Sequence, residues 1–255
     1  MTGDNLAVKH DGRVTRLTLD RPDRRNALAL ATMRELIEAV ETLPGETELV
    51  VLGAEGPVFS AGHDLSEMVG ATEDRHRLLF DVCTEMMLVL HRIPQPVVAK
   101  VQGPATAAGC QLVASCDLAV AADSAWFATP GVKIGLFCST PMVPLTRAVG
   151  RKRAMEMLLT GDRIDSATAV EWGLVNRAVP DERLDAEVED LVERILSSSR
   201  RVVGLGKEAF YSQVDETEED AYRSMAEVMT GNAGLADAQE GMSAFLEKRP
   251  PTWPE

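Results

Sequence analysis

The sequence is short of positive charge. Lysine and arginine together number 26 against 40 aspartates and glutamates, which gives a formal net charge of −14. Nucleic acids and anionic membrane surfaces attract basic proteins, so we expect neither as a partner. A ligand that carries phosphate groups could still bind, but only through a few local cations.

The sequence also lacks paired cysteines and long apolar runs. Cys83, Cys110, Cys116 and Cys138 show no C-x-x-C spacing, so we expect free thiols in a reducing compartment and no metal site. The first ten residues contain no basic region followed by an apolar stretch, so we expect no export signal. No apolar run approaches the roughly 18 residues that span a bilayer, so we expect no membrane insertion. These absences predict a cytoplasmic protein.

What the sequence does contain is an alternation of strand-like and helix-like segments, which gives way to helices alone near residue 181. This order predicts an α/β core followed by a helical section, which we place at residues 1–195 and 196–255. Predicted strands are 14–20, 48–56, 96–103, 117–123 and 174–179. Predicted helices are 28–43, 73–92, 105–116, 141–149, 151–161, 181–198, 202–211, 218–230 and 235–249.

Two segments combine small residues with the end of a predicted strand. They read FSAGHDLSEM at 59–68 and GPATAAGCQL at 103–112. A turn of small residues or the start of a helix can direct unpaired backbone N–H groups at a ligand. Two such groups that converge would form an oxyanion hole, which stabilises a developing negative charge. Each segment taken alone is better explained by an ordinary turn or by close helix packing.

Taken together with the rest of the chain, these segments resemble the crotonase (enoyl-CoA hydratase/isomerase) superfamily. Within it, TAAGCQLVASCD and FATPGV are similar to a subgroup described as enoyl-CoA hydratase domain-containing proteins. The resemblance implies a core of repeated strand–strand–helix (ββα) turns that form a superhelix, with a C-terminal helical region for trimerisation. The matching stretches are RPDRRNAL at 21–28, FSAGHDL at 59–65, residues 96–136, residues 146–180 and EGMSAFLEKRPP at 240–251.

The resemblance also implies a ligand and an assembly. The ligand is an acyl-CoA thioester, with coenzyme A as part of the substrate and no separate cofactor. Its carbonyl oxygen would be held by the backbone N–H groups of His63 and Ala108, an oxyanion hole that stabilises an enolate. The segment from His63 through Asp64 and Leu65 to Ser66 would line the CoA path. The assembly would be a homotrimer or a dimer of trimers.

The chain departs from the hydratase pattern at both catalytic carboxylates. Family hydratases carry glutamates where this chain has Gln111 and Gly131. An amide cannot titrate, and glycine offers no side chain. His63 is the only titratable side chain that the motif places beside the oxyanion hole. It is therefore the candidate substitute base, with a ring that faces solvent or CoA as the alternative. We expect Cys138 to be a buried, inert thiol.

These features leave two main hypotheses. The first is an enoyl-CoA hydratase/isomerase in fatty acid metabolism that acts through a stabilised enolate, with weak hydratase activity. The second is a non-catalytic acyl-CoA binder or sensor that kept the pocket and lost the chemistry. A purely structural oligomer is a third and less favoured reading. Glutamates at positions 111 and 131 together would be expected to raise the hydration rate, provided that the backbone at Gly131 accepts a side chain.

Overall fold

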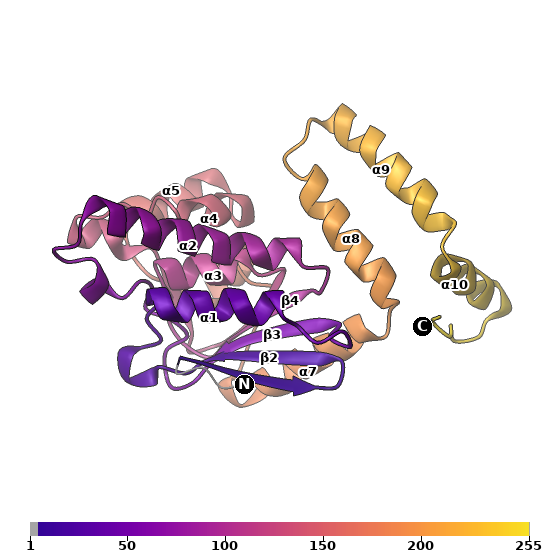
Figure 1. Ribbon diagram of the computed structural model, residues 1–255, viewed down its shortest axis with the longest axis horizontal. Coiled ribbons are helices and arrows are strands. Elements are labelled where there is room, and N and C mark those ends of the chain that lie inside the picture. Colours follow the sequence, from indigo (N-terminus) through magenta and orange to yellow (C-terminus); the bar gives the residue numbers. More distant parts are fainter. Residues whose placement is uncertain (1–4, 255) are drawn as a thin grey trace.

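The computed structural model describes residues 5–254, and its centre is a six-stranded sheet (Figure 1). The strand order is β1-β2-β3-β4-β6-β9, in which β1 and β2 are antiparallel and every later pair is parallel. The strands are β1 (Leu6–Asp11), β2 (Val14–Leu19), β3 (Leu49–Ala54), β4 (Val97–Val101), β6 (Leu118–Ala122) and β9 (Arg177–Val179). All five predicted strands are confirmed, and β1 is an addition.

A second, smaller sheet lies beside the first and contains short strands only. Its order is β5-β7-β8, formed by Ala105–Thr106, Trp126–Ala128 and Ile164–Asp165. Strand β5 follows β4 and β7 follows β6, so the chain passes through one strand of each sheet before a helix. This repeat confirms the predicted strand–strand–helix core.

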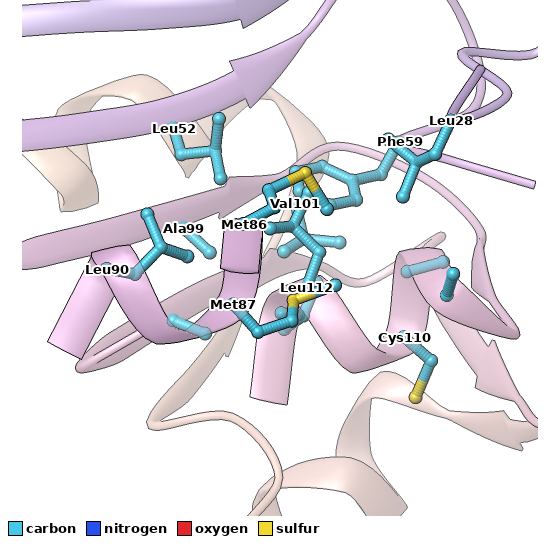
Figure 2. Packing of buried hydrophobic residues seen from close by; sticks show 14 of the residues in the cluster. Leu28, Leu52, Phe59, Met86, Met87, Leu90, Ala99, Val101, Cys110 and Leu112 are labelled. Carbon is cyan, nitrogen blue, oxygen red and sulfur yellow. The ribbon is translucent and has the colours of Figure 1, made fainter. Parts of the chain in front are cut away.

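Helices cover both faces of the large sheet (Figure 1). On one face lie α1 (Leu30–Glu41), α2 (Glu73–Arg92) and α3 (Ala108–Ser115), and α7 (Leu184–Leu196) packs on the other. Figure 2 shows the larger core, in which methionines and leucines of α2 meet α3 beside the strands. The residues are Met86, Met87 and Leu90 of α2, Cys110 and Leu112 of α3, and Leu52, Ala99 and Val101 of the sheet.

Helix α2 has the limits that the sequence predicts. The hydroxyl of Thr72 accepts a hydrogen bond from the Arg75 amide at 3.3 Å, which caps the first turn. The helix ends at Arg92, one residue before Ile93 and the helix-breaking Pro94. Helices α4 (Met142–Ala148) and α5 (Arg151–Thr160) are also confirmed, whereas α6 (Ser166–Trp172) is an addition.

The C-terminal section consists of helices, as predicted. Helices α8 (Arg200–Gln213), α9 (Glu218–Ala233) and α10 (Ala236–Glu247) extend away from the sheet (Figure 1). Within the described residues, no helix is long and apolar enough to cross a membrane.

A buried ionic network fastens α8 to the core. The Nζ of Lys207 donates to the carbonyls of Leu90 and Gln95, at 2.6 and 2.8 Å, and pairs with Asp117 at 2.7 Å. The hydroxyl of Tyr211 donates to the same carboxylate at 2.8 Å. Burial lowers the pKa of Lys207, although the charge of Asp117 acts in the opposite direction. The first C-terminal helix is therefore tied to the ends of α2 and α3.

Candidate active site

The amide of His63 is free to bind a ligand because of how its neighbours pair. His63 forms an isolated parallel bridge with Leu28, in which the Leu28 amide donates to the Gly62 carbonyl at 2.8 Å. The Asp64 amide donates to the Leu28 carbonyl at 3.4 Å. The bridge thus uses the backbone groups of Gly62 and Asp64, which lie on either side of His63. The N–H of His63 itself points away from Leu28. Across residues 5–254 this N–H has no protein acceptor.

The second predicted donor, Ala108, is the first residue of α3. Its N–H belongs to the first helical turn, where amides have no intrahelical partner, and no protein group in the described part of the chain accepts from it. The preceding Ala107 has φ 50° and ψ −118°, a conformation that costs a residue other than glycine about 1–3 kcal/mol. Ala107 is held there because its amide donates to Ala128 and its carbonyl accepts from Gln111, at 2.9 and 3.0 Å.

The two donor segments lie against each other at Gly62. This residue has φ +89°, and a Cβ added there would lie 2.9 Å from the Cβ of Ala107 and 3.1 Å from the amide nitrogen of Ala108. Only glycine accepts both the conformation and the close approach. The sequence prediction that these two segments meet is therefore supported by the packing.

The predicted CoA segment forms a short surface turn, η2 (Leu65–Glu67). The carboxylate of Asp64 caps it, because Oδ1 accepts from the amide and the hydroxyl of Ser66 at 3.1 and 2.6 Å. The Ser66 hydroxyl, with help from Arg24 at 3.3 Å, lowers the pKa of Asp64. Asp64 is thus engaged in shaping the turn, while Leu65 and Ser66 are exposed.

The imidazole of His63 is turned into the protein, so a ring that faces solvent is the wrong alternative. It packs edge-on against Phe80 of α2, with 5.6 Å between ring centroids. Both ring nitrogens are buried, and neither has a hydrogen-bond partner within the described residues. Burial lowers the pKa of His63, and the Leu28 backbone and the charge of Glu67 are weaker opposing influences. Burial therefore favours the neutral form of the ring.

Gln111 stands one helical turn after Ala108, on the same face of α3. Its side chain is 4% exposed, and its Oε1 lies 3.9 Å from the Sγ of Cys83, a long and weak contact. Phe80 and Cys83 are themselves three residues apart on α2, so the His63 ring and Gln111 lie beneath successive positions of one helix face.

Gln111 also lines a cavity of about 610 Å³ bounded by α2, α3, α4 and α8. The cavity wall combines apolar residues such as Met87 and Val143 with polar ones such as His91 and Tyr211. His63 and Ala108 do not line it, so Gln111 is the predicted site residue that does.

Gly131 is buried in the turn η3 (Pro130–Ile134), and a side chain there has no room. An added Cβ would lie 2.6 Å from the carbonyl oxygen of Leu136 and 2.8 Å from the Sγ of Cys138. The obstacle is space and not backbone dihedrals, so the condition for the double substitution, a side chain accepted at position 131, is not met. Cys138 is buried and burial raises the pKa of its thiol, which agrees with an inert role.

Sequence reasoning did not identify Phe80, Cys83 or Ala107 as neighbours of the site. Phe80 and Cys83 fall on one face of the predicted 73–92 helix, which was the available signal. Nothing in the sequence marks Ala107 as strained, because alanine is an ordinary residue at the start of a helix.

A family model described as enoyl-CoA hydratase/isomerase matches residues 9–255. The chain belongs to this family. It is 48% identical to enoyl-CoA hydratase domain-containing protein 3, mitochondrial, of Rattus norvegicus over 248 residues, which cover 96% of this chain and 82% of the relative. These matches also confirm the predicted subgroup of enoyl-CoA hydratase domain-containing proteins.

Solved structures in the family share the whole fold. An enoyl-CoA hydratase of Mycobacterium smegmatis superimposes with a TM-score of 0.96 at 47% identity, covering 98% of this chain and 99% of its own. Human enoyl Coenzyme A hydratase domain-containing protein 3 superimposes with a TM-score of 0.94 at 44% identity, covering 98% and 100%. The predicted crotonase fold is thereby confirmed.

One sequence prediction is contradicted by the family comparison. The relatives from Rattus norvegicus, Danio rerio and Homo sapiens are all named as mitochondrial proteins, so the predicted cytoplasmic location is wrong. The prediction relied on composition and on the lack of a recognised targeting signal. Neither feature distinguishes the cytoplasm from the mitochondrion.

Proposed function

We propose that this family member binds acyl-CoA thioesters and removes a proton from the carbon next to the thioester carbonyl. The observation that carries the proposal is the pair of unpaired amides at His63 and Ala108 beside a buried, neutral imidazole. The amides would hold the carbonyl oxygen, and the half-exposed Arg24 beside Ser66 supplies a local cation for the CoA phosphates.

The proton transfer follows from these groups. Both ring nitrogens of His63 are buried in the unliganded chain, so the ring must turn towards the bound thioester before it acts. A ring nitrogen then takes the proton, the C–H electron pair moves into the thioester, and negative charge collects on the carbonyl oxygen. The two N–H groups stabilise that oxyanion, and removal of one such donor typically costs about 10²–10³ in rate. Water addition has no carboxylate at position 111 or 131, so we propose that hydration is slow.

A non-catalytic acyl-CoA binder is the second candidate. The absence of both family carboxylates favours it, since Gln111 cannot titrate and the space beside Gly131 is filled. The two candidates share the ligand and differ only in whether His63 transfers a proton.

Isotope exchange separates the two candidates. Butyryl-CoA incubated with the protein in D₂O should gain deuterium next to the carbonyl, measured by mass spectrometry. His63→Gln should slow this exchange by about 10²–10⁴-fold, whereas His10→Gln, at the exposed end of strand β1, should leave it unchanged. Unchanged exchange in His63→Gln would remove His63 as the base. Binding without any exchange in the wild type would establish the non-catalytic binder.

We also propose that the protein assembles as a homotrimer or a dimer of trimers. The support comes from apolar side chains on α9 and α10 that a single chain leaves in water, among them Phe245 and Leu246 at 82% and 80% exposure. Met229 and Met242 extend this surface. Light scattering at micromolar concentration should find three or six chains, and a stable monomer would refute the assembly.

A further inference from the structure

Ser60 is buried and contacts both of the segments that carry the free amides. Its backbone pairs with the segment that leads into α3. Its amide donates to the Pro104 carbonyl at 3.2 Å, and its carbonyl accepts from the Thr106 amide at 2.9 Å. Its hydroxyl contacts the other segment, because Oγ accepts from the Gly62 amide at 3.3 Å. One residue therefore links the chain before His63 to the chain before α3.

Hydrogen bonds on both sides of Gly62 determine where the His63 N–H points. The His63 N–H and the Gly62 carbonyl belong to one trans peptide plane, so they point in opposite directions. The Gly62 carbonyl accepts from the Leu28 amide at 2.8 Å, which fixes that plane. The Gly62 amide belongs to the preceding plane, which the Ser60 hydroxyl holds. Because glycine rotates more freely than any other residue, both planes must be held to keep the His63 N–H in one direction.

The direction of the Ser60 hydroxyl is itself fixed by Asn26. The hydroxyl donates to the Asn26 carbonyl at 2.8 Å, so a lone pair of its oxygen is left for the Gly62 amide. Asn26 is buried, with φ 50°, and its side chain anchors it. Its Nδ2 donates to the carbonyls of Glu55 and Val58 at 2.8 and 2.7 Å. The serine hydroxyl thus has one fixed acceptor and one fixed donor.

We infer that Ser60 is a positioning residue, whose hydroxyl aligns the His63 N–H so that it and the Ala108 N–H meet at one carbonyl oxygen. This inference rests on the proposed function, because it requires a thioester oxygen at the two amides. Misalignment should affect the reaction more than binding, since the negative charge on that oxygen is largest in the transition state. A serine that served stability alone would leave the bound carbonyl unchanged, which separates the two roles.

The carbonyl stretch of bound butyryl-CoA, labelled with ¹³C at the thioester carbon, reports on the two donors in isotope-edited infrared spectra. In the wild type the stretch should lie at lower frequency than that of the free thioester, because two N–H groups polarise the bond. Ser60→Ala removes the hydroxyl and keeps the backbone bonds to Pro104 and Thr106. The frequency shift should therefore fall to about half, since one of the two donors loses its alignment.

The reaction should respond more strongly than the affinity. Deuterium exchange into saturating butyryl-CoA should slow by about tenfold in Ser60→Ala, which is less than the loss of about 10²–10³ for a donor that is removed altogether. The dissociation constant, measured by isothermal titration, should stay within about threefold of wild type.

The matched control is Ser166→Ala on α6, which removes another buried hydroxyl that donates to a backbone carbonyl, that of Asp123 at 3.1 Å. It should leave the frequency shift and the exchange rate as in the wild type. Ser60→Cys is a second variant, because a thiol is only a weak donor and acceptor, and its frequency shift should also fall. Melting temperatures show which variants are folded, and either Ser60 variant suffices.

The carbonyl frequency decides the outcome. A folded Ser60 variant with the full wild-type shift overturns the inference and leaves acyl-CoA binding intact. A wild type that does not bind butyryl-CoA, or binds it without a frequency shift, overturns the proposed function and the inference with it. If the wild type binds without deuterium exchange, the frequency shift alone tests the alignment of the two amides.

Discussion

Positions 111 and 131 both lack the carboxylate that the family resemblance implies, yet their surroundings differ. At position 111 the side chain keeps nearly the size of glutamate, lies beside a thiol at 3.9 Å and borders a cavity. At position 131 the side chain is gone, and the Leu136 carbonyl and the Cys138 sulfur stand where one would begin. Position 111 has room for a side chain and differs from glutamate only in the chemistry of that side chain. Position 131 has no room for a side chain.

The difference shows that a missing side chain does not by itself leave a vacancy. A backbone carbonyl cannot swing aside as the end of a flexible side chain can, so the turn at 136–138 fixes glycine at position 131. The side chain at position 111 can be exchanged without moving the chain. Substitutions at the two positions should therefore affect stability very differently.

The largest effect is expected for Gly131→Glu. The new Cβ would overlap the Leu136 carbonyl, and a carboxylate would be forced into a buried turn, so unfolding should become easier by about 3 kcal/mol or more. Urea denaturation followed by circular dichroism measures this change. The paired control is Gly206→Glu on the exposed side of α8, where nothing lies within 4 Å of an added Cβ.

Gly206→Glu should leave stability unchanged or raise it by up to about 1 kcal/mol, because glycine is a poor helix former. Equal losses at the two positions would show that the carboxylate, and not the crowded turn, causes the damage.

A smaller, pH-dependent effect is expected for Gln111→Glu. The buried carboxylate should have a pKa above the usual value of about 4.3, because burial disfavours its charged form. The unfolded chain then releases its proton at lower pH than the folded chain, so stability relative to wild type falls as pH rises above about 4.3. The loss is about 1.4 kcal/mol per unit by which the folded pKa is raised.

Unfolding free energies at pH 5 and pH 8 measure this trend, with the exposed Gln239→Glu as control. A loss that is the same at both pH values would place the new carboxylate in water.

Hydration of crotonyl-CoA by Gln111→Glu should stay within about tenfold of wild type, because the second carboxylate is still missing.

The smallest effect concerns the two atoms that crowd Gly131. Gly131→Ala alone should cost about 1–3 kcal/mol, and adding Cys138→Ala should recover part of it by removing the sulfur. A double-mutant cycle should give a coupling energy of about 0.5–1 kcal/mol. Recovery is incomplete since the Leu136 carbonyl remains, and a coupling of zero would mean that the backbone alone excludes the side chain.

The sequence predicted the regular parts of the fold well because their signals are local. The helix at 73–92 has a capping threonine, acidic residues in its first turn and a proline just beyond its end. The strands β5, β7 and β8 were not predicted, because strands of two or three residues are too short to show periodicity, and β5 falls inside the predicted helix 105–116. Pairing with distant segments, and not local preference, forms these strands. Helix α6 was also missed, although Asp165 and Gly173 cap its two ends.

For the site, the sequence predicted two backbone amides that have no acceptor among residues 5–254, and two altered positions, but not how the neighbouring side chains lie. The burial of the His63 ring depends on Phe80, which lies on a different helix. The closure around Gly131 depends on a turn whose path no local pattern specifies. Motifs locate main-chain functions well because backbone geometry follows the fold, whereas side-chain environments depend on contacts between distant segments.

The ionic network that holds α8 determines which part of the C-terminal section unfolds together with the core. Detaching α8 would break the ion pair between Lys207 and Asp117 and the hydrogen bonds from Lys207 to the Leu90 and Gln95 carbonyls. Helix α9, in contrast, buries none of its residues in a single chain. Backbone amides of α8 should therefore exchange with deuterated solvent as slowly as those of the neighbouring core, and those of α9 much sooner. The cooperative unit of a single chain thus extends past the sheet through α8, whereas α9 would gain such protection only from a second chain.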